Sequence, residues 1–133
     1  MILRIHPLAV LLMVSSLVGC TDDVVSSRHQ TRADAADIVD RGWIPAVLPD
    51  SARDIRESHN LDSNVGHGTF VFGATDADAF KAALVPIPAD HPAKAESRST
   101  LQRSGYLLYS FEDFEIAVNW TERKGEFWLG RQQ

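Results

Sequence analysis

Two histidines and a carboxylate near the middle of the chain are the residues whose types could support chemistry. His59, Asp62 and His67 lie close together in the sequence. Imidazole nitrogens and carboxylates bind zinc, and they also transfer protons near neutral pH. Their spacing is irregular and no third ligand is obvious, so ordinary strand and turn residues are the alternative interpretation. The three remain candidates for a metal site or an acid–base pair, while the overall pattern predicts no metal and no cofactor.

Ser51 is a second candidate, as a nucleophile. A nucleophilic serine needs a neighbouring base and an oxyanion hole. The G-x-S-x-G segment that builds such a site in many hydrolases is absent from the sequence. The simpler interpretation is that Ser51 starts a turn or caps a short helix. We therefore predict no catalytic residue.

Five large aromatic side chains can either line a ligand-binding face or pack in a core: Trp43, Trp120, Trp128, Tyr106 and Tyr109. Packing is the expectation for Trp43 and Trp120. Trp128 is different, because alternation with core-facing Phe127 and Leu129 would turn it outward. We therefore predict Trp128 as an interaction residue.

A β-hairpin is the element that would bring the two histidines together. Residues 54–61 alternate in the manner of an edge strand, with Ile55, Glu57 and His59 on one side. Residues 62–64 favour a turn, and residues 65–72 favour a strand that begins as a bulge at Gly66 and Gly68. A short helix starting at Asp50 or Ser51 is the alternative for the first strand.

The remaining pattern alternates short helices with strands. Thr31 and Asp34 resemble a helix cap, which predicts a helix over 33–41 ended by Gly42. Thr75 is expected to cap a second helix over 76–84, and a long polar loop follows over 86–104. Three strands over 106–111, 114–121 and 126–129 form a meander, with a tight turn at Lys124–Gly125. The predicted fold class is α+β: an antiparallel sheet of about five strands with two short helices packed on one face.

The first twenty residues have the order of an export signal. Arg4 supplies positive charge, an apolar run follows from Leu8 to Val14, and small residues precede Cys20. That run is shorter than the roughly 20 residues that a transmembrane helix needs. An ordinary secretory signal that happens to contain a cysteine is the alternative.

The segment Leu17-Val18-Gly19-Cys20 resembles the lipobox of bacterial lipoproteins. The resemblance implies cleavage after Gly19 and acylation of Cys20, so the bilayer becomes a partner through that residue. Cys20 is the only cysteine in the chain, so an internal disulfide is excluded. Thr21 follows in place of Asp, which by the same resemblance favours the outer membrane over the inner one.

Charge and composition divide the chain into three parts. We predict a lipoprotein signal peptide over 1–19, a lipidated cysteine and polar tether over 20–31, and a single α+β domain over 32–133. The net charge of −5 at pH 7 argues against nucleic acid as a partner.

One segment resembles a known group of proteins. Trp43-Ile-Pro-x-x-Leu-Pro-x-Ser-Ala-x-x-Ile55, followed by His59 to Asn64 and then Phe70, is similar to small bacterial lipoproteins that carry a W-[IL]-P-x-x-L-P-x-S-A-x-x-I segment. That group has no assigned activity, so the resemblance implies export and anchoring and transfers no catalytic residue.

These observations predict a membrane-anchored periplasmic lipoprotein whose domain is not an enzyme and binds an envelope protein or the envelope itself. One alternative is a small hydrolase or metal-binding protein that uses His59, Asp62 and His67. Another is an inhibitor or immunity-type lipoprotein, and a third is a purely structural component of the envelope.

Overall fold

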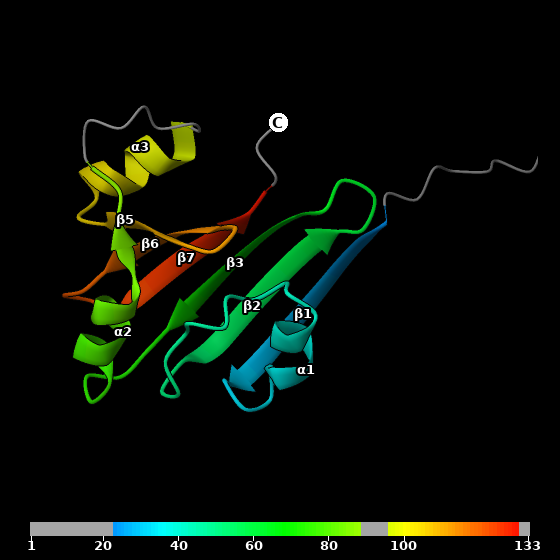
Figure 1. Ribbon diagram of the computed structural model, residues 1–133, viewed down its shortest axis with the longest axis horizontal. Helices are drawn as coiled ribbons and strands as arrows, with labels where there is room; N and C mark the ends of the chain where they lie inside the picture. The colour runs from blue at the N-terminus through cyan, green and yellow to red at the C-terminus, as the bar shows by residue number, and fades with distance from the viewer. Residues whose placement is uncertain (1–22, 89–95, 131–133) are drawn as a thin grey trace, which may run out of the picture.

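Seven strands form one antiparallel sheet in the computed structural model, which describes residues 23–88 and 96–130 (Figure 1). Their order across the sheet is β1-β2-β3-β7-β6-β5-β4. The strands are β1 (Val24–Thr31), β2 (Arg53–Asn60), β3 (Val65–Val71), β4 (Val85–Pro86), β5 (Leu107–Phe111), β6 (Phe114–Asn119) and β7 (Lys124–Leu129). The export signal and Cys20 lie outside the described residues.

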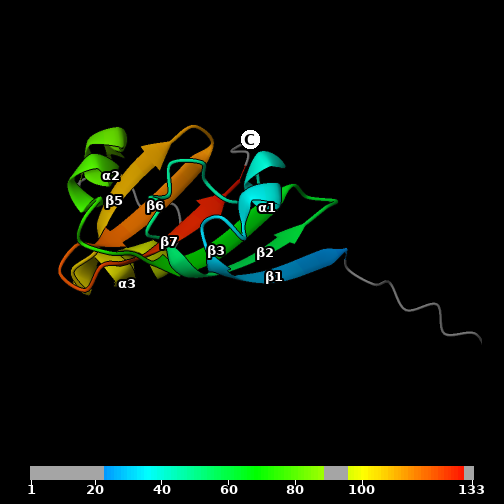
Figure 2. The same ribbon diagram turned by 90° about the horizontal axis from the view of Figure 1, so that it is seen from below.

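Three helices in the described part of the chain cover the sheet unequally. α1 (Ala36–Asp40) and α2 (Ala77–Ala83) lie on one face, and α3 (Glu96–Arg103) lies on the other (Figure 2). We call the face under α1 and α2 the inner face and its opposite the outer face. α3 packs on the outer face at the β5–β6 side, where Leu101 meets Leu108 and Ala117. The outer face of β1, β2 and β3 is covered by no described helix.

The α+β class and the antiparallel sheet are confirmed, but the strand count and the helix placement needed correction. The sheet has seven strands instead of about five, because β1 and β4 extend its two edges. The predicted tether over 20–31 is β1 from Val24 onward, and the predicted loop over 86–104 contains α3. Both segments are polar, so neither carries the apolar period that marks a buried element.

The first helix ends where its sequence indicates but begins later than predicted: α1 starts at Ala36, and Ala35 is its N-cap without a side-chain cap hydrogen bond. The Thr31 amide donates to the Asp34 carboxylate at 3.2 Å, and the Asp34 amide donates to the Thr31 hydroxyl at 3.1 Å. This reciprocal pair has the pattern of a capping box, but it stabilises the turn over residues 32–35 that precedes α1. Gly42 ends the helix at a φ of +84°, a conformation that glycine adopts without strain.

Aromatic rings fill the core between the sheet and the two inner helices. Phe70, Phe72, Phe80 and Phe127 are each at most 3% exposed, and neighbouring rings meet mainly at tilted or edge-on angles. Two glycines make room for these rings. A Cβ on Gly68 would lie 2.1 Å from Phe127, and one on Gly125 would lie 2.5 Å from Phe70.

Three local predictions were wrong. The register irregularity falls in β2 between Arg53 and Arg56, not at Gly66 and Gly68, because Asp54 takes a positive φ of 46°. Lys124 and Gly125 are paired residues of β7, and the turn precedes them, with Arg123 at a φ of 51°. Asp76, not Thr75, occupies the N-cap position of α2.

Candidate functional site

The uncovered outer face of β1, β2 and β3 is hollowed into an open groove. Its volume is about 620 Å³, and its lining includes six residues whose side chains alternate onto this face: Ser26, Arg28, Arg56, Ser58, His67 and Thr69. We call this set the polar groove. Each of these side chains carries a hydrogen-bonding group, while most of the exposed lining of this shallow groove is apolar.

Strand register places the groove residues in two rows across the sheet. Ser26 pairs with Ser58, Ser58 with His67, and His67 with Trp128. In the second row Arg28 pairs with Arg56, and Arg56 pairs with Thr69. Directly paired residues of antiparallel strands point to the same face, so each row is a continuous line of side chains.

Two arginines stand side by side in the second row. Like charges directly opposite each other destabilise a sheet. Asp54 offsets part of this repulsion, since its Oδ1 lies 2.8 Å from Nη2 of Arg28 and 3.7 Å from Nε of Arg56. Asp54 is the carboxylate shared by the two guanidinium groups, a second carboxylate, that of Glu126, lies beside His67, and both arginine side chains are more than half exposed.

The first row ends in an imidazole and an indole. His67 and Trp128 have ring centroids 5.5 Å apart, and Nε2 of His67 lies 3.4 Å from the Glu126 carboxylate. Ser26 and Ser58 share a hydroxyl–hydroxyl hydrogen bond of 2.9 Å. The row therefore offers hydroxyls at one end and aromatic surface at the other.

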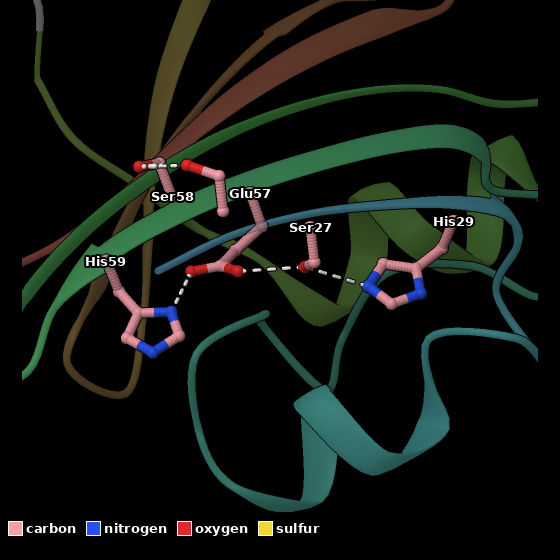
Figure 3. Close-up of polar contacts among 6 residues, drawn as sticks. Ser27, His29, Glu57, Ser58 and His59 are labelled. Carbon is pink, nitrogen blue, oxygen red and sulfur yellow. Dashed lines mark hydrogen bonds and ion pairs between the residues drawn. The ribbon is translucent and has the colours of Figure 1, made fainter. Parts of the chain in front are cut away.

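The inner face of the same strands holds a chain of hydrogen bonds, which we call the inner network: Ser27, His29, Glu57 and His59. The Glu57 side chain is fully buried and accepts from the Ser27 hydroxyl at 3.0 Å and from Nδ1 of His59 at 2.5 Å. His29 contacts the Ser27 hydroxyl through Nε2 at 2.9 Å. Figure 3 shows Glu57 pointing toward these partners, with the Ser58 hydroxyl on the other side of the strand.

Trp43 packs against the His59 end of the inner network. Its ring stacks on His59 with centroids 3.9 Å apart and planes 10° from parallel. The Glu57 carboxylate contacts the Ser27 hydroxyl and His59 separately. In a hydrolytic triad, by contrast, the carboxylate orients a histidine, and that same histidine activates the serine. The arrangement therefore differs from a nucleophilic site and satisfies buried polar groups instead.

The predicted cluster of His59, Asp62 and His67 is not brought together. His59 pairs with Gly66, and His67 pairs with Ser58. The two imidazoles therefore point to opposite faces of the sheet, while Asp62 lies exposed in the turn between the strands. Among the described residues, no group of three or more His, Cys, Asp or Glu side chains could hold a metal ion.

Ser51 has a defined structural contact. Its hydroxyl donates to Oδ1 of Asp76 at 2.5 Å, its amide donates to Oδ2 at 2.9 Å, and the Gly73 amide donates to its hydroxyl. Burial raises the pKa of the Asp76 carboxyl, but the hydrogen bonds from Ser51 outweigh this effect and hold that pKa below its ordinary value. Ser51 thus joins the segment between α1 and β2 to the start of α2.

The predicted aromatic residues divide as their alternation suggests. Trp120 packs in the inner core and donates from Nε1 to the Tyr109 hydroxyl at 2.8 Å. Tyr106 packs in the outer cluster under α3. Phe127 is fully buried on the inner face while Trp128 is half-buried on the outer face, so its predicted orientation is confirmed. Its role as an interaction residue stays a prediction.

Sequence reasoning missed Arg28, Arg56, Ser27, His29 and Glu57 as a group. The signal was present in part, because the alternation of residues 54–61 already puts Glu57 and His59 on one side and Arg56 and Ser58 on the other. The sequence did not indicate that β1 is a strand. Once Ser27 and His29 belong to a strand, they alternate onto the inner face and Arg28 onto the outer one.

A family model, that of the YbbD head domain, matches residues 23–71. That segment begins just before β1 and ends with β3, so it contains both the polar groove and the inner network. No curated protein and no solved structure matches the chain. In the described part of the chain, no helix is long and apolar enough to cross a membrane.

Proposed function

We propose that this protein is an exported, lipid-anchored binding domain of the bacterial cell envelope, without catalysis of its own, and that it binds through the polar groove. The observation that carries this proposal is the uncovered outer face of β1, β2 and β3. It is hollowed to about 620 Å³ and lined by side chains that donate and accept hydrogen bonds.

Charge favours a ligand that carries a carboxylate or a phosphate. The chain as a whole has a net charge of −5, yet Arg28 and Arg56 stand side by side with Asp54 as their shared carboxylate. Guanidinium groups match planar oxyanions with two parallel hydrogen bonds. The hydroxyls of Ser26, Ser58 and Thr69 suit sugar hydroxyl groups, so an acidic glycan is the ligand class that we propose.

Anchoring is the second part of the proposal, and it depends on the lipobox-like segment that ends at Cys20. The wild-type protein, purified from membranes, is expected to carry acyl mass on Cys20. A Cys20→Ser form is expected to leave the membrane fraction and appear in the soluble periplasmic fraction. The proposed anchoring would be contradicted if Cys20→Ser remained in the membrane fraction and the wild type carried no acyl group.

Calorimetry on the full-length protein in detergent tests the groove. The probe is an oligogalacturonate, and its neutral methyl ester is the comparison ligand. We expect binding of the acid form and weaker binding of the ester. We expect a loss of about tenfold or more for Arg28→Gln and for Arg56→Gln, because a hydrogen bond to a charged group contributes enough for that factor.

Arg41→Gln is the matched control, because Arg41 is an exposed arginine at the C-cap of α1, outside the groove lining, and it forms an ion pair with Asp37 at 3.0 Å. It is expected to bind as the wild type does. Equal binding of acid and ester would reject the acidic ligand class. If all three arginine variants bind as the wild type does, the polar groove is not the binding site.

A further inference from the structure

We propose that the end of the sheet formed by the start of β1 and the β2–β3 turn rests on the membrane surface, and so fixes the orientation of the anchored domain. The surface consists of Val24, Val25, Leu61 and Val65, which we call the apolar tip. This inference rests on the proposed acylation of Cys20 and goes beyond it, because an acyl anchor alone leaves a domain free to tumble.

The first observation is where the exposed apolar side chains gather. Six large hydrophobic side chains of the described residues are exposed, and four of them form the apolar tip. Their exposures run from 42% for Val25 to 54% for Leu61. Exposed apolar residues are common singly, but a group at one end of a domain marks a contact surface.

The second observation is that these four residues lie at the same end of the sheet, with Val24 and Val65 on its outer face and Val25, which pairs with His59, on its inner face. Val24 pairs with Asn60, and Asn60 pairs with Val65, so one row of the sheet ends in this tip. The Leu61 amide donates to the carbonyl of Asp23 at 3.0 Å, which ties the turn to the start of β1. Figure 1 shows β1 beginning beside the β2–β3 turn.

The third observation is the short chain between the tip and the anchor. Three residue steps separate Cys20 from Asp23, where the described structure begins. Even a fully extended chain spans only about 11 Å over three steps. A lipid on Cys20 therefore holds Asp23, where the apolar tip begins, within about 11 Å of the attachment point. The opposite edge of the sheet, at β4, has no such restraint.

Charges near the tip determine which lipid surface fits. Asp23 and Asp62 lie beside the apolar residues and are exposed, so an anionic surface would repel the tip. A surface rich in zwitterionic headgroups removes this repulsion. Aliphatic side chains that reach the boundary between headgroups and acyl chains gain from leaving water. We therefore commit to a zwitterionic bilayer as the occupant of this surface.

Site-specific fluorescence measures the contact directly. Cys20 is the only cysteine, and in the proposed lipoprotein its thiol is bound to diacylglycerol as a thioether, so an added cysteine is the single labelling site. Leu61→Cys and Leu107→Cys form a matched pair, because both leucines are 54% exposed and Leu107 lies toward the other edge of the sheet. The acylated, bimane-labelled proteins are placed in phosphatidylethanolamine vesicles that contain a minor share of phosphatidylglycerol and a lipid with a quencher near its headgroup.

We expect the label at position 61 to be blue-shifted and quenched at least about twofold more than the label at 107. We also expect this quenching to fall as the share of phosphatidylglycerol rises, because Asp23 and Asp62 are then repelled. Equal quenching at 61 and 107 in acylated protein would overturn the membrane contact while leaving the anchor intact. A wild type that carries no acyl mass would instead show that the proposed anchoring itself has failed.

Discussion

The N-terminal half of the domain, residues 23–71, and the C-terminal half, residues 72–130, use the two faces of one sheet in different ways. In the C-terminal half, aromatic rings fill the inner face, and α3 covers part of the outer face. In the N-terminal half, a buried glutamate–histidine pair lies beside core residues such as Ile55 and Phe70 on the inner face, and a polar groove lies open on the outer face. The C-terminal half thus resembles an ordinary core, whereas the N-terminal half adds buried polar groups to the apolar inner face and leaves its outer face polar and open.

This contrast indicates where stability and binding reside. Burying a charged pair rarely stabilises a fold more than apolar side chains of the same size would. Two arginines directly opposite each other add a further cost that Asp54 only partly offsets. The N-terminal half therefore keeps features that do not favour stability, and the apolar core shared by both halves supplies the compensating packing. That division is what a binding surface supported by a rigid core requires.

The largest effect is expected where aromatic packing is densest. Phe80 is 3% exposed, and its ring lies 5.4 to 6.0 Å from those of Phe70, Phe72 and Trp120. Phe80→Ala leaves a cavity beneath α2 and is expected to lower the free energy of unfolding by about 3–5 kcal/mol. Urea denaturation measures it. Leu107→Ala, at an exposed position of the same half, is expected to change that free energy by less than about 0.5 kcal/mol.

A smaller and more local effect is expected in the N-terminal half. Glu57→Gln keeps the shape of the side chain but gives it only one acceptor oxygen for the two donors, Ser27 and His59. We expect a loss of about 1–3 kcal/mol, since a buried polar group loses its partner. Because Ser27 links this network to the edge strand β1, amide hydrogen exchange should accelerate first in residues 24–31.

Ser58→Ala is the matched control for Glu57→Gln. Ser58 lies next to Glu57 in β2, but its hydroxyl bonds to Ser26 on the exposed outer face. Its loss is expected to leave hydrogen exchange in β1 close to that of the wild type. Uniform acceleration across all seven strands in Glu57→Gln would show that the network supports the whole sheet and not β1 alone.

The sequence allowed prediction of the elements that bury one side. β2 and β6 alternate between their two faces, β3, β5 and β7 are rich in aromatic or β-branched residues, and α1 and α2 carry apolar faces, so pattern and composition indicated each of them. β1 was not predicted as a strand because its eight residues are held by backbone pairing to β2 rather than by burial. α3 was not predicted as a helix because most of its residues are polar. Its Leu101 packs against the outer-face cluster that contains Leu108 and Ala117.

The candidate site was harder to predict because it depends on register between distant strands. Arg28 and Arg56 are 28 positions apart in sequence and become neighbours only through the pairing of β1 with β2. The histidine prediction failed for a related reason. A register one residue different would have put His59 and His67 on the same face, whereas the observed pairing of His59 with Gly66 separates them.

The contact between Ser51 and Asp76 crosses from one half to the other, and it predicts the smallest of the three effects. Ser51→Ala removes a hydroxyl that donates to the Asp76 carboxylate and accepts from the Gly73 amide. We expect a loss of about 1 kcal/mol near neutral pH, a typical value for one hydrogen-bonding group. Urea denaturation of the wild type and the variant, at pH 6 and at pH 3, measures it.

The dependence of this loss on pH follows from the lowered pKa of Asp76. A folded pKa below the ordinary value of 3.8 means that ionised Asp76 stabilises the fold above that pH. The contribution disappears as the pH falls through the folded pKa, so the difference between wild type and Ser51→Ala should shrink at pH 3. Other carboxylates titrate equally in both proteins and cancel in the comparison. A difference of the same size at both pH values would mean that Ser51 acts through Gly73 alone, and that the charge of Asp76 does not link the two halves.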